Sequence, residues 1–227
     1  MTTPHDRPVG DDLLQEALAI VRRAAEQAGL PTPAVALAPS VGKPGAPRAN
    51  AEYKAILGVP TITVATAAMQ ELPPDPLEVL LTHELGHFAD EAWWKRKTRQ
   101  FLAGMGFAVL LAIGGVVVGP IGENSGAGYA PGLAIFAVSL LIAGALGLTY
   151  LANSRTSELR ADRFAARQHG KLSSAQALFT AWDRDCPEPT QHRRLRLPLR
   201  THPYRATRLT AIEAEINRHD PPATRRT

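Results

Sequence analysis

Residues 83–87 read His83-Glu84-Leu85-Gly86-His87, and this stretch decides how the rest of the chain is interpreted. Two histidines four residues apart lie on one face of a helix, so both imidazoles can bind one metal ion. Glu84 follows the first histidine and can accept a proton from an attacking water molecule. The flanking residues are mostly apolar, as expected of a helix buried on one side. The alternative interpretation is a surface helix with incidental histidines.

A catalytic zinc site needs a third protein ligand and an open fourth position. Glu158 and Asp162 lie four residues apart on a second predicted helix. One of these carboxylates can bind the metal while the other orients a ligating histidine. Alone, such a pair is typical of a solvated helix face. Further along, an imidazole at His202 can stabilise the oxyanion of a tetrahedral intermediate, whereas an ordinary loop histidine is the alternative.

These motifs, followed by His202-Pro203 and Arg208, resemble in content and order those of the M48 peptidases. That family includes HtpX-like membrane proteases and CAAX prenyl proteases. The resemblance covers roughly residues 50–208 and implies a gluzincin with one Zn²⁺ per chain. The residues that it implies as zinc ligands are His83, His87 and Glu158, with Glu84 as the general base.

The same resemblance implies roles for further residues. Asp162 is expected to be the hydrogen-bond partner of a ligating histidine, His83, and His202 to lie near the oxyanion. Asn50-Ala51 is similar to a pair that precedes the family's substrate-binding strand, so Asn50 and Arg208 are expected at substrate-binding positions. The family also suggests that a peptide adds antiparallel to an edge strand, which we place within residues 56–64.

Two long runs, Phe101 to Gly119 and Pro131 to Leu151, contain no charged residue. Each has about 20 residues, which as a helix extends about 30 Å, the hydrocarbon thickness of a bilayer. A pair of buried core helices is the alternative. The intervening segment, Pro120 to Ala130, is predicted to be the tip of a transmembrane hairpin. HtpX-like proteins similarly carry two spans here, and two more at the N-terminus that have no counterpart in this sequence.

Basic residues flank both runs, whereas the tip carries only an acidic residue, Glu123. The positive-inside rule therefore places both termini and the metal site in the cytoplasm of a two-span protein of the cell membrane. Small residues four apart, at Gly115 and Gly119 and at Ala143 and Gly147, are predicted to let the two helices approach closely. The basic flanking residues are Lys95, Arg96, Lys97, Arg99, Arg155, Arg160 and Arg163.

Composition excludes several other classes of protein. The single cysteine, Cys186, excludes an internal disulfide and fits a reducing compartment. The net charge of +4 is modest, and no nucleic-acid-binding motif is present, so the basic residues near the spans indicate anionic lipid. The N-terminal residues resemble neither a signal peptide nor a transit peptide.

The predicted fold is α+β: a mostly helical gluzincin-type domain with a small β-sheet and an inserted two-helix transmembrane hairpin. Its predicted divisions are a disordered tail (1–10), the first part of the peptidase domain (11–98), the hairpin (99–152), the second part of that domain (153–218) and a tail (219–227). The predicted elements are helices at 13–28, 153–168, 173–184 and 202–217, strands at 31–37 and within 53–64, the metal-site helix with Asp75 as its cap, and an irregular segment at 186–200. Ser173 or Ser174 is the predicted cap of the third of these helices.

The function that these features predict is a membrane-anchored zinc endopeptidase that acts on polypeptides, including misfolded or membrane-proximal segments. Glu158 follows the second run by seven residues, about 10 Å of helix, so the metal is expected just beneath the inner membrane face. An intramembrane metalloprotease of the site-2 type is one alternative, although Asp90 and Glu91 flank the motif. The protease module of a membrane-bound antibiotic sensor and a non-catalytic membrane adaptor that keeps zinc for structure are the others.

Overall fold

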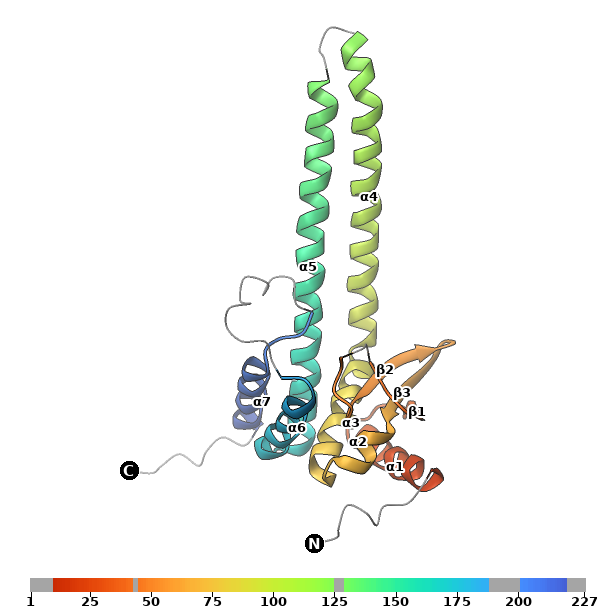
Figure 1. The fold of residues 1–227 in the computed structure, drawn as a ribbon, viewed down its shortest axis with the longest axis vertical. Helices are drawn as coiled ribbons and strands as arrows, with labels where there is room; N and C mark the ends of the chain where they lie inside the picture. Colours follow the sequence, from red (N-terminus) through yellow and green to blue (C-terminus); the bar gives the residue numbers. More distant parts are fainter. Residues whose placement is uncertain (1–9, 43–44, 125–128, 188–200, 220–227) are drawn as a thin grey trace, which may run out of the picture. The chain divides into compact units, whose positions relative to one another are not determined.

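The computed structural model describes residues 10–42, 45–124, 129–187 and 201–219, and the chain divides into two compact units. The first unit consists of Met1–Glu91, Ser157–Arg193 and His202–Thr227, and the second of Ala92–Thr156 and Arg194–Thr201. Figure 1 shows the helices and the small sheet, which confirm the predicted α+β class. The helices are α1 (Asp11–Gln27), α2 (Thr66–Glu71), α3 (Pro74–Ala89), α4 (Glu91–Asn124), α5 (Ala130–His169), α6 (Leu172–Asp185) and α7 (Arg205–His219), and the strands are β1 (Ala34–Ala38), β2 (Ala51–Ile56) and β3 (Val59–Ala65).

The sheet of the first unit has the order β1-β3-β2, with β1 parallel and β2 antiparallel to β3. The central strand β3 has the β-branched composition of a buried strand, and its Ile62 and Val64 are fully buried. The prediction of a substrate-binding edge strand within residues 56–64 is therefore wrong, because β3 is hydrogen-bonded on both sides. The edge strand of this hairpin is β2.

Helix α3, which carries the His-Glu-x-x-His motif, runs through the core of the first unit. It contacts α1, α6, β2 and β3, and its side chains Leu77, Leu80, Leu81 and Leu85 are fully buried. The buried residues of α3 therefore lie on several sides of the helix and not along a single apolar face. This burial fixes the direction in which the two histidines point.

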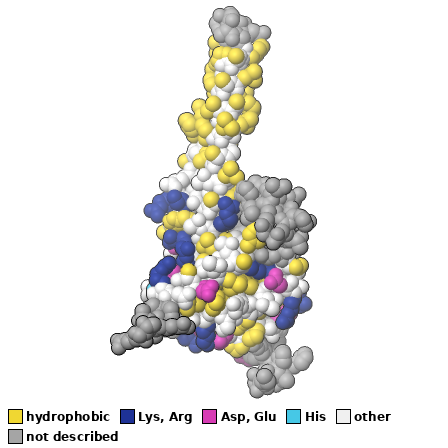
Figure 2. Space-filling model, turned by 90° about the vertical axis from the view of Figure 1, so that its left-hand side faces the viewer, with side chains coloured by type: hydrophobic (Ala, Val, Ile, Leu, Met, Phe, Trp, Pro, Cys, Tyr) yellow, Lys and Arg dark blue, Asp and Glu magenta, His cyan; other side chains and the backbone are white. Residues whose placement is uncertain are grey.

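The second unit consists of α4 and the first part of α5. Both helices are long and apolar enough to cross a membrane, and only 11% of each apolar window is buried. Figure 2 shows many hydrophobic side chains on the visible surface of the apolar part of these helices. Such exposure argues against the alternative of a pair of buried core helices.

Glycines bring the two long helices into close contact. A Cβ atom added at Gly115 would lie 2.7 Å from the carbonyl oxygen of Gly132, and one added at Gly132 would lie 2.7 Å from the Cα of Gly119. The predicted contact at Gly115 and Gly119 is therefore confirmed. The predicted contact at Gly147 is wrong, because no heavy atom lies within 4 Å of a Cβ added there.

Several predicted boundaries are wrong for identifiable reasons. The second apolar run and the Glu158 helix form one continuous helix, because nothing interrupts α5 before Gly170, which has a φ of 62°. The last helix begins after Pro203, because a residue that precedes proline avoids the helical conformation. Asp75 is not a cap but lies in the first turn of α3, where it pairs with Lys171. Helix α2 was not predicted.

The N-cap of α6 is Lys171, so the predicted caps Ser173 and Ser174 lie inside that helix. Most of the two predicted tails and of the predicted irregular segment at 186–200 lies outside the described residues. Residues 125–128 of the predicted hairpin tip lie outside them as well. The helices on either side of this tip extend to Asn124 and begin at Ala130.

Candidate metal centre

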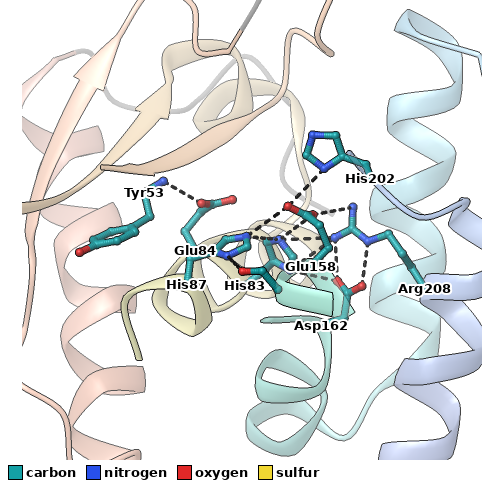
Figure 3. A network of polar contacts seen from close by, with 9 residues as sticks. Tyr53, His83, Glu84, His87, Glu158, Asp162, His202 and Arg208 are labelled. Atoms are coloured by element: carbon teal, nitrogen blue, oxygen red, sulfur yellow. Dashed lines mark hydrogen bonds and ion pairs between the residues drawn. The ribbon is translucent and has the colours of Figure 1, made fainter. Parts of the chain in front are cut away.

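His83 and His87 project from one face of α3 and meet edge to face. Their Nε2 atoms are 3.2 Å apart, and their ring centroids are 4.8 Å apart with the rings perpendicular. Figure 3 shows both imidazoles directed toward the carboxylate of Glu158 on α5. The helical spacing of four residues produces this pairing directly.

Glu158 completes a triangle with the two imidazoles. Its Oε2 atom is 3.7 Å from Nε2 of His83, and its Oε1 atom is 3.5 Å from Nε2 of His87. Two ligands at about 2.0–2.1 Å from a tetrahedral zinc ion are about 3.3 Å apart. The spacing and chemistry of these two nitrogens and one carboxylate therefore fit a zinc ion.

Gly86 explains why the helices that supply the three ligands lie so close together. A Cβ atom added at Gly86 would be 2.8 Å from the Cα atom of Ala161 and 3.1 Å from its carbonyl oxygen. The backbone of α3 therefore rests directly on α5, within one turn of helix of the ligands. Any side chain at position 86 would separate them.

Glu84 lies beside this triangle but is held differently from Glu158. The ligand atoms of His83, Glu84 and His87 lie within 4.8 Å of one another, so Glu84 is also a possible ligand. However, its Oε2 accepts a hydrogen bond of 2.8 Å from the backbone N–H of Tyr53 in β2. Burial raises the pKa of Glu84 to about 7. A carboxylate so placed suits proton transfer better than metal binding.

The Glu158 carboxylate has the opposite electrostatic character. Burial alone would raise its pKa, but hydrogen bonds with His202 and His83 and the charge of Arg208 hold the pKa well below its ordinary value. Glu158 is therefore anionic at neutral pH, as a zinc ligand must be.

Asp162 contacts the Nδ1 atom of His83, on the side of the imidazole away from the centre. Its Oδ1 atom is 3.0 Å from Nδ1 of His83. Burial alone would lower the pKa of this imidazole, but hydrogen bonds with Asp162 and Glu158 outweigh burial and raise it to about 9. The contact places a proton on Nδ1 and leaves Nε2 directed at the centre, which is the orientation that a metal requires.

Arg208 in turn holds Asp162. Its Nε and Nη2 atoms donate hydrogen bonds of 2.8 and 2.7 Å to the two carboxylate oxygens. Burial would raise the pKa of Asp162, but the charge and hydrogen bonds of Arg208 lower it to about 2. Arg208 is buried, and its guanidinium lies over the rings of Phe179 and Trp182. This placement favours a positioning role over the substrate contact expected from the sequence.

His87 has a different supporting contact, which sequence analysis did not find. The Oγ atom of Ser157 is 3.4 Å from Nδ1 of His87. Burial and the neighbouring His83 lower the pKa of His87 to about 4, so its imidazole is neutral at physiological pH. The only sequence signal for Ser157 is its position directly before Glu158.

The remaining predicted residues lie on loops. His202 precedes α7, its side chain is 64% exposed, and its Nδ1 atom is 3.2 Å from Oε1 of Glu158. Asn50 precedes β2, and its carbonyl oxygen accepts a hydrogen bond from the N–H of Ala65. The structure thus brings His202 to the centre and places Asn50 at the beginning of the edge strand.

Comparison with known proteins connects this centre to a family. The chain matches the family model "Peptidase family M48" over residues 14–216. A Protease HtpX of Xanthomonas oryzae pv. oryzae is 30% identical over 171 residues, which cover 71% of this chain and 54% of that protein. A Protease HtpX of Xanthomonas axonopodis pv. citri is 29% identical over 171 residues, with the same coverage.

A third relative, a Protease HtpX of Xanthomonas campestris pv. campestris, is 29% identical over 168 residues, which cover 70% of this chain and 53% of that protein. The chain therefore spans about half the length of the curated relatives that it matches. No solved structure gives a significant match to the chain.

Proposed function

Because this chain belongs to peptidase family M48, we propose that it is a membrane-anchored, zinc-dependent endopeptidase. The observation that carries the proposal is the triangle of His83, His87 and Glu158, whose ligand atoms are spaced for one zinc ion. The relatives named Protease HtpX support a proteolytic function. Glu84 beside the triangle adds the base that hydrolysis needs.

The proposed zinc ligands are His83, His87 and Glu158. When bound, zinc supplies Lewis-acid chemistry, which polarises the scissile carbonyl and makes a water molecule more acidic. Asp162 and Ser157 contact the Nδ1 atoms of the two rings, so that both Nε2 atoms remain directed at the centre.

Glu84 is the proposed general base. It accepts a proton from the attacking water and passes this proton to the leaving amine. Its pKa near 7 suits a group that must both accept and release a proton at neutral pH. The N–H of Tyr53 holds one carboxylate oxygen and leaves the other for the water. His202, on an exposed loop at the centre, donates a hydrogen bond to the oxyanion of the tetrahedral intermediate.

The proposed substrates are unfolded polypeptide segments that add antiparallel to β2. This edge strand passes the catalytic base, because the backbone N–H of Tyr53 reaches Glu84. An extended peptide paired with β2 would therefore run beside the metal centre. Misfolded membrane proteins and membrane-proximal segments fit such a site, and membrane-protein quality control is the corresponding role.

The proposed anchor is the pair of helices α4 and α5, which crosses the cell membrane twice. The basic residues before the first apolar run and after the second support a cytoplasmic location for the metal centre and both termini. A proteolytic site in the cytoplasm also agrees with the single, unpaired Cys186.

The test uses the full chain purified in detergent micelles and an unfolded casein as the substrate. Glu84→Gln is expected to keep zinc and lose nearly all cleavage, because the ligands remain and the base is removed. The matched control is Glu78→Gln, the same substitution on a half-exposed surface of the same helix. Cleavage and zinc content are followed by mass spectrometry. Cleavage by Glu84→Gln at the rate of the control would remove Glu84 from the mechanism. Zinc binding without cleavage by the unaltered chain would leave a structural zinc site as the explanation.

A further inference from the structure

The turn that joins β2 to β3 exposes an unusual apolar surface. Among the described residues of the first unit, the exposed large hydrophobic side chains are Ile56, Leu57 and Val59, which are 48%, 100% and 53% exposed. We name these three residues the apolar turn. In Figure 1 the hairpin that carries them projects away from the other elements of its unit. Contacts within the unit therefore do not account for their apolar character.

The backbone of the turn makes Leu57 still less expected. Leu57 has a φ of 50° and Gly58 a φ of 82°, so both central residues are left-handed, as in a type I′ turn. Asn-Gly or Asp-Gly is favoured in such a turn, because asparagine and aspartate tolerate this conformation. Leu57 is the one non-glycine residue with positive φ among the described residues. A leucine with a strained backbone and a fully exposed side chain indicates that this side chain contacts something outside the first unit.

The base of the hairpin is attached to the point where the chain leaves the first unit. The ring of Tyr53 in β2 packs against Phe88 with centroids 5.7 Å apart, and burial and the nearby carboxylate of Glu91 raise the pKa of its hydroxyl. From Tyr53 to Leu57 the strand extends about 13 Å. From Glu91 to the beginning of the uncharged run at Phe101, α4 extends about 15 Å. Each apolar stretch thus begins a short distance along the chain, about 13 Å or 15 Å, from this attachment point.

The chemistry of the turn favours lipid over a polypeptide partner. Residues 55–61 carry no charged side chain, and the preceding Lys54 pairs with Glu52, so that no net charge opposes entry into a lipid headgroup region. Peptide recognition uses a groove or a strand edge with pockets for alternate side chains, whereas the tip of the turn lies beyond the end of the β2 edge at Ile56. Exposed aliphatic side chains on a projecting element are suited to insertion at the boundary between headgroups and acyl chains.

We propose that the apolar turn inserts into the headgroup region of the same bilayer that α4 and α5 cross. This inference rests on the membrane anchoring proposed above. The turn is then a second membrane contact, made by the unit that carries the metal centre. It would hold the edge strand β2 close to the lipid surface, where membrane-proximal substrates emerge.

The experiment places single environment-sensitive NBD labels on the full chain in a Cys186→Ser background. The labelled positions are Leu57→Cys and Val59→Cys in the turn, Gln176→Cys on an exposed surface of α6, and Val116→Cys in the apolar run. The variants are reconstituted in vesicles of phosphatidylcholine and phosphatidylglycerol. Doxyl groups on the lipids, either near the headgroup or deep in the chain, quench NBD at matching depth. Circular dichroism checks that each variant is folded.

Labels at positions 57 and 59 are expected to be several-fold more strongly quenched by shallow doxyl groups than the label at position 176. The label at position 116 is expected to respond to deep doxyl groups. Quenching at 116 without quenching at 57 or 59 would overturn the inference and leave the anchoring intact. An unquenched label at 116 would overturn the anchoring itself. A change in NBD fluorescence at position 57 that requires added casein would show that the turn binds polypeptide. A change that disappears when the protein is diluted with lipid would show that the turn contacts a second copy of the chain. Either result would contradict the proposal.

Discussion

At the scale of single residues, each metal-facing histidine is fixed by a different partner. Asp162 and Arg208 form a buried ion pair behind His83, whereas among the described residues the Nδ1 atom of His87 contacts the hydroxyl of Ser157. A carboxylate partner increases the basicity of an imidazole and selects its tautomer, and a hydroxyl does this less strongly. The two histidines are therefore expected to contribute unequally to metal affinity, with His83 the better-defined ligand.

Replacement of Asp162 tests this difference. Asp162→Ala is expected to weaken zinc affinity about 10–100-fold, because His83 loses the partner that fixes its tautomer. Competition with a chromogenic chelator measures the affinity. Asp12→Ala, on an exposed first turn of α1, is the control and should bind zinc as the unaltered chain does. An unchanged affinity in Asp162→Ala would mean that the carboxylate serves only to neutralise Arg208.

Arg208 allows a separate prediction about stability. Removal of one partner of a buried ion pair leaves the other charge uncompensated, so Arg208→Met is expected to destabilise the zinc-free protein by about 3 kcal/mol. Thermal unfolding in detergent, with a chelator present, measures this change. Arg218→Met removes a mostly exposed partner of Glu215 and is expected to have little effect. Equal melting temperatures for the two variants would contradict the buried role of Arg208.

At the scale of elements, the distance between α3 and α5 controls the centre. Alanine normally stabilises a helix relative to glycine by up to about 1 kcal/mol. At Gly86 the added Cβ would meet the backbone of Ala161 at 2.8 Å, and backbone cannot give way as a flexible side chain can. The steric effect is therefore expected to exceed the gain in helix propensity.

Gly86→Ala is accordingly expected to lower stability by about 1–3 kcal/mol and to reduce zinc occupancy, because the two helices must move apart. Gly144→Ala is the matched control, since no heavy atom lies within 4 Å of its added Cβ. Melting temperature and zinc content are measured for both. Full occupancy and unchanged melting in Gly86→Ala would show that the helices tolerate a wider separation.

The elements also show which features a sequence can predict. His83, His87, Glu158 and Asp162 were found because a spacing of four residues on a helix is a local property. The contact of Glu84 with Tyr53 was missed because a backbone N–H has no sequence signature and lies 31 residues away. The edge strand was misplaced because β-branched composition indicates a strand but not its neighbours in the sheet.

At the scale of the whole molecule, the metal centre is assembled from two segments of the sequence, and the residues of the second unit lie between them along the chain. Ser157 lies 70 residues after His87, which it contacts. Closure of so long a loop has an entropic cost, which grows slowly with length. The rings of Trp94 and Tyr150, near the two ends of the inserted segment, pack with centroids 5.5 Å apart and so bring these ends together. Formation of the hairpin is therefore expected to precede metal binding.

The orientation of the chain can be tested by cysteine labelling in intact cells, in a Cys186→Ser background. A probe in Tyr129→Cys, at the end of the hairpin, is expected to react with a membrane-impermeant reagent. A probe in Ser40→Cys, in the first unit, is expected to react only after the cells are lysed. The expectation follows from the basic residues that flank the two apolar runs. The reverse pattern of labelling would invert the proposed orientation.

The hydrogen bond from Tyr53 to Glu84 has a consequence for how such a protein can diversify. The donor is a main-chain amide, so every amino acid except proline supplies it. Substitutions at position 53 would leave this contact to the base in place and would alter the packing of the side chain against Phe88. Stability could then vary at this position over generations without a matching loss of turnover. In a directed-evolution library randomised at this codon, active clones should vary in melting temperature, and proline should be the residue that selection removes.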